Sequence, residues 1–209
     1  MKILIADDHA VVRRGLKQIL LDEYPILHVG EAEDAHGVMR LAGEQPWDIV
    51  VLDISMPGRN GLEVLKELRQ AYPKLPVLVL TAHPEEQYAI RVLKAGAAGY
   101  MTKESAPEHL LEAVRKVIGG RRYISPTLAD LLAAAVGGDP ERPPHEALSD
   151  REYQVLCLIA SGKTVGQIAE ELSLSVNTIS TYRARVLEKM GMRTNADLTH
   201  YAISNRLVA

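Results

Sequence analysis

Three aspartates follow short apolar segments in the N-terminal half of the chain. Asp7 and Asp8 come directly after the first segment, and Asp53 comes after the third. Two further polar side chains, those of Thr81 and Lys103, follow later segments of the same kind. Three neighbouring carboxylates repel one another, so they need a cation or shifted pKa values. Oxygen ligands without histidine or cysteine favour Mg²⁺ over Zn²⁺.

One Mg²⁺ together with Lys103 would offset these acids and leave a place for a transferring phosphoryl group. The metal ion and the ammonium would stabilise the equatorial oxygens of that group while Asp53 attacks in line. Formation of an aspartyl-phosphate is known carboxylate chemistry. We therefore expect Asp53 to be a phosphoacceptor and Mg²⁺ to be the cofactor.

This chemistry requires the side chains to meet at one edge of a sheet, and residues 1–118 predict such a sheet. Short apolar runs without polar alternation indicate strands that are buried on both faces. They alternate with helical segments, which predicts an α/β fold: a flavodoxin-like, doubly wound, five-stranded parallel sheet in the order 2-1-3-4-5. The predicted strands are 3–6, 27–30, 49–52, 77–80 and 98–101, and the predicted helices are 10–21, 36–42, 62–71, 85–95 and 107–118.

The rest of the chain predicts a linker and a smaller all-α domain. We assign residues 1–120 to the first domain, 121–147 to a linker with a short helix over 128–136, and 148–209 to the second domain. Two glycines and three prolines within 137–144 mark the boundary. Four helices follow, with predicted N-caps at Ser149, Ser175 and Asn195, and the last helix is expected to end near residue 207.

Helices over 165–172 and 176–190, joined by the turn 173–175, form the outline of a helix-turn-helix. The N-terminal residues of such a recognition helix point at base edges, while flanking cations take phosphates. We expect base-edge contacts from Ser180, Thr181 and Ala184. We expect mainly phosphate contacts from Asn177, Thr178, Arg183, Arg185 and Lys189. Guanine is a further target of Arg183 or Arg185.

Composition excludes several other classes of protein. With 209 residues, 47% apolar and 24% charged, the chain is neither disordered nor a coiled-coil rod, and its net charge of −3 argues against a generic nucleic-acid coat. The single cysteine, Cys157, excludes an intrachain disulfide and fits a reducing compartment. Every apolar run is far shorter than the roughly 20 residues that cross a bilayer. We expect a cytoplasmic protein without a membrane partner.

Residues 1–120 resemble the receiver domain of two-component response regulators. The likeness rests on Asp7-Asp8, on Asp-Ile-Ser-Met-Pro-Gly-Arg-Asn-Gly-Leu from position 53, on Thr81-Ala82, and on Ala-Gly-Ala-Ala-Gly-Tyr-Met-Thr-Lys over 95–103. The resemblance implies that Asp8, Asp53 and the backbone carbonyl of Ser55 ligate Mg²⁺, with Asp7 acting through water. It implies a phosphoryl-binding and switch set in which Tyr100 rotates inward behind the threonine: Thr81, Lys103, Tyr100 and Ala82.

Residues 148–207 resemble the LuxR-type helix-turn-helix of the NarL/FixJ subfamily. The matching strings begin with Leu-Ser-Asp-Arg-Glu at position 148, Gln-Ile-Ala-Glu-Glu-Leu at 167 and Asn-Thr-Ile-Ser-Thr-Tyr at 177. Ser180 stands where the subfamily commonly has a basic residue, and Tyr182 stands where it has histidine, so fewer cations face the DNA. The last helix offers a pairing face that could equally be internal core: Leu198, Tyr201, Ala202 and Ile203.

Together the two resemblances imply a phosphorylation-activated, DNA-binding transcriptional regulator of a two-component system. A sensor histidine kinase would phosphorylate Asp53, a homodimer would then bind double-stranded DNA, and RNA polymerase is a further candidate partner. On this interpretation the protein catalyses only the phosphorylation and dephosphorylation of its own aspartate and is not otherwise an enzyme.

Two alternatives to this interpretation stay open. One is a Mg²⁺-dependent aspartyl-phosphate phosphatase, which would need a second aspartate where this chain has Ser55. The other is a regulator of the same fold that works without phosphorylation.

Overall fold

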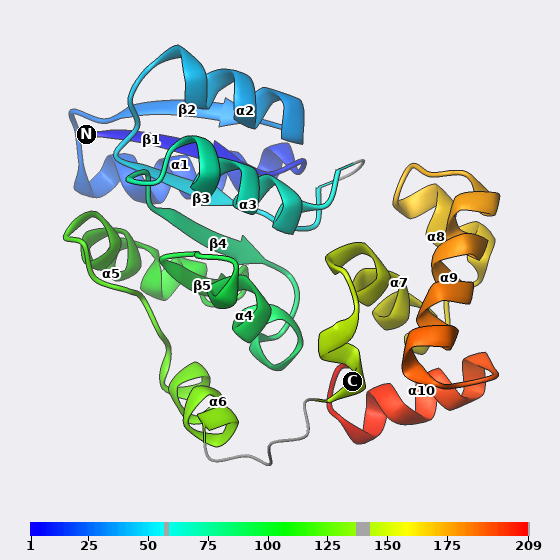
Figure 1. Cartoon of the computed structure of the whole chain (residues 1–209). Helices are drawn as coiled ribbons and strands as arrows, with labels where there is room; N and C mark the ends of the chain where they lie inside the picture. Colours follow the sequence, from blue (N-terminus) through cyan, green and yellow to red (C-terminus); the bar gives the residue numbers. More distant parts are fainter. Residues whose placement is uncertain (57–58, 137–142, 209) are drawn as a thin grey trace. The chain divides into compact units, whose positions relative to one another are not determined.

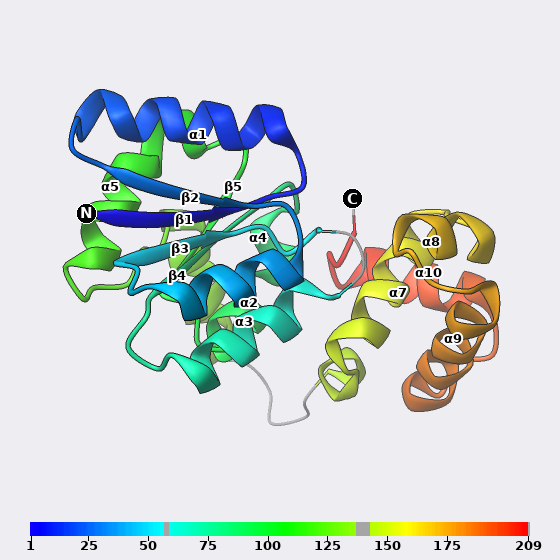
Figure 2. The ribbon, with the colours of Figure 1, turned by 90° about the horizontal axis from the view of Figure 1, so that it is seen from above.

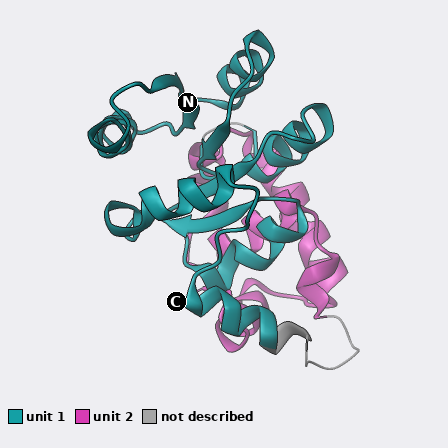
Figure 3. Cartoon of the chain, turned by 90° about the vertical axis from the view of Figure 1, so that its left-hand side faces the viewer, with its two compact units in different colours: residues 1–133 teal, residues 134–209 magenta. Residues whose placement is uncertain are grey.

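The structure is a computed structural model of the whole chain, and it describes residues 1–56, 59–136 and 143–208 (Figure 1). The chain divides into two compact units, Met1–Ala133 and Ala134–Ala209 (Figure 3). Most of the boundary predicted over 137–144 lies outside the described residues. Within the described ranges, no helix has the length and apolar character needed to cross a membrane.

The first unit is a parallel sheet with helices on both faces. Its strands run in the order β2-β1-β3-β4-β5, as predicted, and every neighbouring pair is parallel. Figure 2 shows α1 and α5 on one face and α2 and α3 on the other. The strands are β1 (Lys2–Ala6), β2 (His28–Ala32), β3 (Ile49–Leu52), β4 (Val77–Thr81) and β5 (Gly99–Thr102). The helices are α1 (Ala10–Glu23), α2 (Ala35–Glu44), α3 (Gly61–Ala71), α4 (Glu85–Lys94) and α5 (Ala106–Ile118), and α6 (Pro126–Val136) begins in this unit and ends just past its last residue.

The inner strands are apolar throughout because helices cover both of their faces. Every residue of β3 and β4 is buried, and the side chains of α1 and α5 complete the core on one side of the sheet. The edge strand β2 is exposed over much of its length. The prediction that this strand ends at residue 30 was wrong, because the strand continues to Ala32. The polar Glu31 interrupts the apolar run on which the prediction was based.

The segment after α5 packs along the open edge of β5. The Tyr123 amide donates to the Ala98 carbonyl oxygen at 2.9 Å. A Cβ atom on Gly99 would lie 2.8 Å from the Tyr123 carbonyl oxygen, so only glycine admits this approach. Helix α6 then begins at Pro126, two residues before the predicted start, because proline is tolerated in the first turn of a helix.

The second unit is all-helical. It contains a 3₁₀ turn, η1 (Pro144–Ala147), and the helices α7 (Asp150–Ala160), α8 (Val165–Glu171), α9 (Val176–Met190) and α10 (Asn195–Ser204). The predicted caps Ser149 and Ser175 are confirmed, since their hydroxyls accept from the amides of Glu152 and Thr178.

The predicted cap Asn195 was wrong. Thr194 caps α10, because its hydroxyl accepts from the Asp197 amide and the Asp197 carboxylate accepts from the Thr194 amide, which completes a capping box. The helix also ends at Ser204 rather than near residue 207, and Arg206 has a positive φ of 55°.

The last helix serves partly as core. Leu198 and Ala202 are fully buried inside the unit, whereas Tyr201 is half-buried and Ile203 is exposed. Of the four residues considered for a pairing face, only Tyr201 and Ile203 therefore remain available to a second copy.

Candidate functional site

The sheet brings the predicted site residues of the first unit to one edge. Because all five strands are parallel, their carboxyl ends meet there. The backbone pairing continues one step past the strands: the Asp53 amide donates to Ala6 at 2.8 Å, and the Lys103 amide donates to Thr81 at 2.8 Å. The positions of Asp53 and Lys103 thus follow from the sheet itself rather than from mobile loops.

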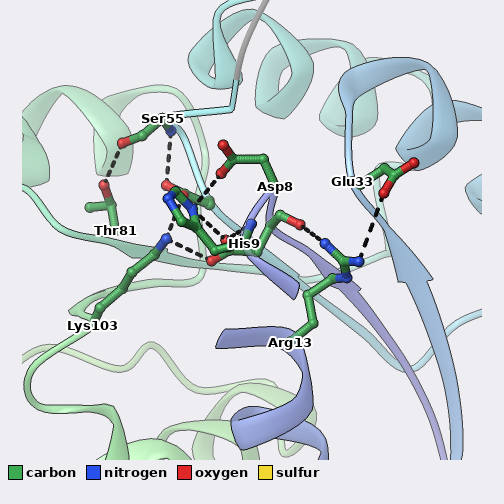
Figure 4. Close-up of polar contacts among 9 residues, drawn as sticks. Asp8, His9, Arg13, Glu33, Ser55, Thr81 and Lys103 are labelled. Atoms are coloured by element: carbon green, nitrogen blue, oxygen red, sulfur yellow. Dashed lines mark hydrogen bonds and ion pairs between the residues drawn. The ribbon is translucent and has the colours of Figure 1, made fainter. Parts of the chain in front are cut away.

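One lysine lies between two buried aspartates. The Lys103 Nζ atom is 2.7 Å from Asp7 Oδ2 and 2.7 Å from Asp53 Oδ2, and it points into the cluster in Figure 4. Asp7 and Asp53 are each only 1% exposed. Burial lowers the pKa of Lys103, but its hydrogen bonds to Asp53 and Asp7 outweigh this effect and raise the pKa above its ordinary value. The ammonium therefore stays charged at neutral pH.

The three carboxylates of Asp7, Asp8 and Asp53 outnumber the ammonium of Lys103, and this excess of negative charge fits a site for a divalent metal ion. One potential ligand atom from each of Asp7, Asp8, His9 and Asp53 lies within 4.8 Å of the others. Asp8 Oδ1 is shielded from solvent and accepts no hydrogen bond from the described residues, although His9 Nδ1 lies 2.8 Å away. An oxygen-rich, anionic donor set of this kind suits a hard cation. Sequence reasoning missed His9, whose only signal was its place directly after Asp7 and Asp8.

Ser55 has two contacts at this site. Its amide donates to Asp53 Oδ1 at 2.8 Å, and its hydroxyl lies 3.1 Å from the Thr81 hydroxyl. The first contact orients the Asp53 carboxylate, and the second ties Thr81 to the loop after β3. The ligand role of the Ser55 carbonyl stays a prediction.

Tyr100 lies inward, beneath the loop between β4 and α4. It is fully buried, and its hydroxyl donates to the carbonyl oxygens of His83 at 2.9 Å and Pro84 at 3.3 Å. Burial raises the pKa of Tyr100, so the phenol stays protonated and can donate. Ala82 is exposed on the same loop, next to Thr81. The inward rotation of Tyr100 during switching stays a prediction.

In the second unit, α9 presents the residues predicted to contact DNA. Asn177, Ser180, Thr181, Ala184, Arg185 and Lys189 are exposed, and Thr178 and Arg183 are half-buried. Sequence reasoning missed Val176, an apolar side chain that is 53% exposed at the first position of this helix. Its signal was a valine directly after the cap, and such a group can contact a thymine methyl.

Two of these cations have partners inside the protein. Arg183 Nε donates to Asn195 Oδ1 at 2.6 Å, and Lys189 Nζ lies 2.7 Å from Glu152 Oε2. Burial raises the pKa of Glu152, but the bonds from Lys189 and Ser149 outweigh it and hold the pKa below its usual value. The charge of Lys189 is thus largely offset by Glu152 of α7, whereas Arg183 bonds to a neutral amide and keeps its charge, and Arg185 has no carboxylate partner among the described residues.

Comparison with known proteins agrees with both halves of this description. The family model described as the response regulator receiver domain matches residues 3–115. The model described as bacterial regulatory proteins of the luxR family matches residues 146–202. The fold and the site thus define a receiver domain followed by a LuxR-type helix-turn-helix domain. The chain belongs to the response regulators.

Similar proteins match along almost the whole chain. The response regulator GacA of Pseudomonas aeruginosa is 37% identical over 210 residues, which cover 100% of this chain and 98% of GacA. The response regulator UvrY of Escherichia coli is 35% identical, with 99% and 95% covered. Among solved structures, RcsB of Salmonella enterica serovar Typhimurium, bound to promoter rprA in the presence of the phosphomimetic BeF3-, has a TM-score of 0.66 at 28% identity and covers 98% of this chain and 99% of RcsB.

Proposed function

We propose that the protein is a phosphorylation-activated transcriptional regulator whose Asp53 accepts a phosphoryl group from a sensor histidine kinase. The observation that carries this proposal is the Lys103 ammonium at 2.7 Å from both Asp7 and Asp53 at the carboxyl edge of the sheet. A buried carboxylate beside a fixed cation is suited to attack phosphorus and to have its product stabilised.

In the proposed step, an Asp53 carboxylate oxygen forms a bond to phosphorus. The phosphorus–nitrogen bond of the kinase phosphohistidine breaks, and its electron pair returns to the histidine nitrogen. Lys103 stabilises the phosphoryl oxygens, and the Ser55 amide holds Asp53 in place through the 2.8 Å contact. Asp7, Asp8, Asp53 and the Ser55 carbonyl would hold Mg²⁺, which supplies further positive charge when bound.

The switch would then use Thr81, Ala82 and Tyr100. Thr81 exchanges its contact with Ser55 for a phosphoryl oxygen, and the loop above Tyr100 moves with it. In our proposal this change favours a homodimer that places two α9 helices on double-stranded DNA, where RNA polymerase is the further partner. In support of a link between the phosphorylated state and DNA binding, the similar protein RcsB is bound to promoter rprA in the presence of the phosphomimetic BeF3-. Such a regulator works in the cytoplasm.

The first test is phosphorylation of the full chain by acetyl phosphate with Mg²⁺. We expect acid-labile phosphate on the wild type and on the control Asp130→Asn, an exposed aspartate, but none on Asp53→Asn. Phosphate on another residue of Asp53→Asn would refute the assignment. Multiple turnovers of phosphate esters that are not phosphodonors would favour the phosphatase alternative instead.

The second test is selection of DNA sites from random sequence with and without beryllofluoride. We expect enrichment of paired half-sites about one DNA turn apart, roughly 34–36 Å, only with beryllofluoride and only for a chain that retains Asp53. Equal enrichment without beryllofluoride would favour the regulator that works without phosphorylation.

A further inference from the structure

An arginine on α1 contacts the backbone of the acidic site from outside the cluster. Arg13 Nη1 donates to the carbonyl oxygen of Asp7 at 2.7 Å, and Figure 4 shows its side chain reaching toward the turn that carries Asp8 and His9. The Arg13 side chain is only 12% exposed. The family matches and the proposed phosphoryl transfer assign it no role.

Carboxylates at the end of β2 hold the other side of the guanidinium. Arg13 Nε lies 3.4 Å from Glu31 Oε2, and Nη2 lies 3.8 Å from Glu33 Oε2. Lys17 adds a second cation, 2.9 Å from Glu31 Oε1. The hydrogen bond from Lys17 holds the pKa of Glu31 below its ordinary value against the effect of burial, and Arg13 lowers it further. Glu31 is therefore an anion at neutral pH and orients the guanidinium.

The contact matters because of where the Asp7 carbonyl lies. It follows the last residue of β1, and the Asp7 carboxylate Oδ1 is itself engaged by the His9 amide at 2.8 Å. The carbonyl of Asp7 and the amide of Asp8 belong to one planar peptide unit. A donor fixed on this carbonyl therefore limits rotation of the peptide that joins the two aspartates and sets the direction of both carboxylates.

We propose that Arg13 is a positioning residue for the acidic site: its guanidinium, fixed by Glu31 and Glu33, holds the Asp7–Asp8 peptide and so keeps both carboxylates in place for the cation and the phosphoryl group. The inference rests on the proposed function. Neighbouring Arg14 provides a matched control, because it is exposed and makes no polar contact with any described residue.

The experiment compares full-length wild type, Arg13→Ala, Arg13→Lys and Arg14→Ala in three measurements. Titration calorimetry reports Mg²⁺ binding, hydrogen exchange reports protection of the segment that contains Asp8 and His9, and acetyl phosphate reports the phosphorylation rate as a function of Mg²⁺ concentration.

For Arg13→Ala we expect a Mg²⁺ dissociation constant raised about tenfold, since loss of a group that orients metal ligands typically costs 10–100-fold. Exchange of the Asp8–His9 segment rises, and the lower phosphorylation rate recovers partly at high Mg²⁺. Arg14→Ala stays within about twofold of wild type in all three. Arg13→Lys keeps the charge but loses the fork that spans carbonyl and carboxylates, so its values lie between those of wild type and Arg13→Ala.

Two results would overturn the proposal. One is Mg²⁺ affinity and exchange in Arg13→Ala equal to those of Arg14→Ala, while the wild type is phosphorylated on Asp53. The other is wild-type behaviour of Arg13→Lys, which would show that the charge alone matters and not the fork of the guanidinium. If Arg13→Ala fails to fold, the comparison of Arg13→Lys with wild type decides between the two. A wild type that binds Mg²⁺ but takes no phosphate would refute the proposed function and leave the Mg²⁺ and exchange comparison intact.

Discussion

At the scale of single residues, the site depends on one ammonium shared by two carboxylates. Asp7 and Asp53 are buried, and the Lys103 side chain is 18% exposed. Separating such a pair leaves a buried charge without compensation, which costs more than the pair itself contributes to stability. The arrangement that, in our proposal, prepares Asp53 for a phosphoryl group therefore also makes Lys103 important for the stability of the domain.

Lys103→Met should destabilise the first unit most strongly in the absence of a divalent cation. We expect a loss of about 2 kcal/mol, less than the 3–5 kcal/mol of a fully buried pair because Lys103 is partly exposed. Millimolar Mg²⁺ should recover part of this loss, because it supplies positive charge to the same carboxylates. Thermal unfolding with and without Mg²⁺ measures both effects, and Lys74→Met, which removes an exposed lysine, is the control. An equal effect of both variants would contradict the argument.

At the scale of secondary-structure elements, helix α6 is joined to the first turn of α4, the helix that follows the loop with Thr81 and Ala82. The Ser125 hydroxyl donates to Glu85 Oε2 at 2.6 Å, and it accepts from the Leu128 amide at 3.0 Å. Glu85 lies in the first turn of α4, and Leu128 is fully buried. One hydroxyl thus caps α6 and holds it against α4.

Ser125→Ala should loosen α6 while leaving the sheet intact. Loss of a capping hydroxyl costs about 1 kcal/mol, and the link to α4 is lost with it. Hydrogen exchange should rise in the amides of α6, with little change in β1 and β3. Thr127→Ala, an exposed neighbour without a polar contact to the described residues, is the control. Unchanged exchange in α6 would show that the hydroxyl does not hold the helix.

The ion pair between Glu152 of α7 and Lys189 of α9 makes the stability of the second unit depend on pH. The folded-state pKa of Glu152 lies below its ordinary value, so the stabilisation is fully present above the unfolded pKa of about 4.3 and is lost as the pH falls through the folded pKa. Glu152→Gln keeps the capping interaction, because glutamine also serves in a capping box, and removes only the charge.

We therefore expect Glu152→Gln to cost about 1 kcal/mol at pH 7, and we expect that difference from wild type to vanish toward pH 3. Thermal unfolding of the full chain from pH 7 to pH 3 provides the measurement. Glu188→Gln, on the exposed face of α9, should match wild type throughout. A difference that persists at the lowest pH would mean that the charge of Glu152 is not the cause.

At the scale of the whole molecule, one chain combines a phosphoryl-accepting unit with a DNA-binding unit. The formal net charge is −3, so DNA binding depends on the local cations of α9 rather than on the overall field. Each recognition helix carries few cations, and we expect useful affinity only when two copies bind together. Ile203, exposed on α10, is available for such a pairing.

Arg183→Ala should weaken DNA binding and its dependence on salt in the beryllofluoride-treated full chain. Arg183 uses Nε for Asn195, and neither Nη group has a partner among the described residues. Loss of one phosphate contact should lower the slope of log K against log salt by about 0.9 per bound domain. Arg14→Ala removes the same charge from the other unit and should leave the slope unchanged. An unaltered slope for Arg183→Ala would exclude a phosphate contact.

The sequence by itself determined the strand order and the side chains at the carboxyl edge of the sheet. Apolar runs such as those of β3 and β4 are strong local signals, and a parallel arrangement then places Asp7, Asp53 and Lys103 together without further information. The capping box at Ser149 was equally local, since both partners lie within four residues.

Only the tertiary structure decided which atoms meet. Lys103 bridges two aspartates from other strands, Arg13 contacts a backbone carbonyl, and Lys189 is offset by Glu152. Such contacts depend on rotamers and on distances between elements that periodicity does not encode.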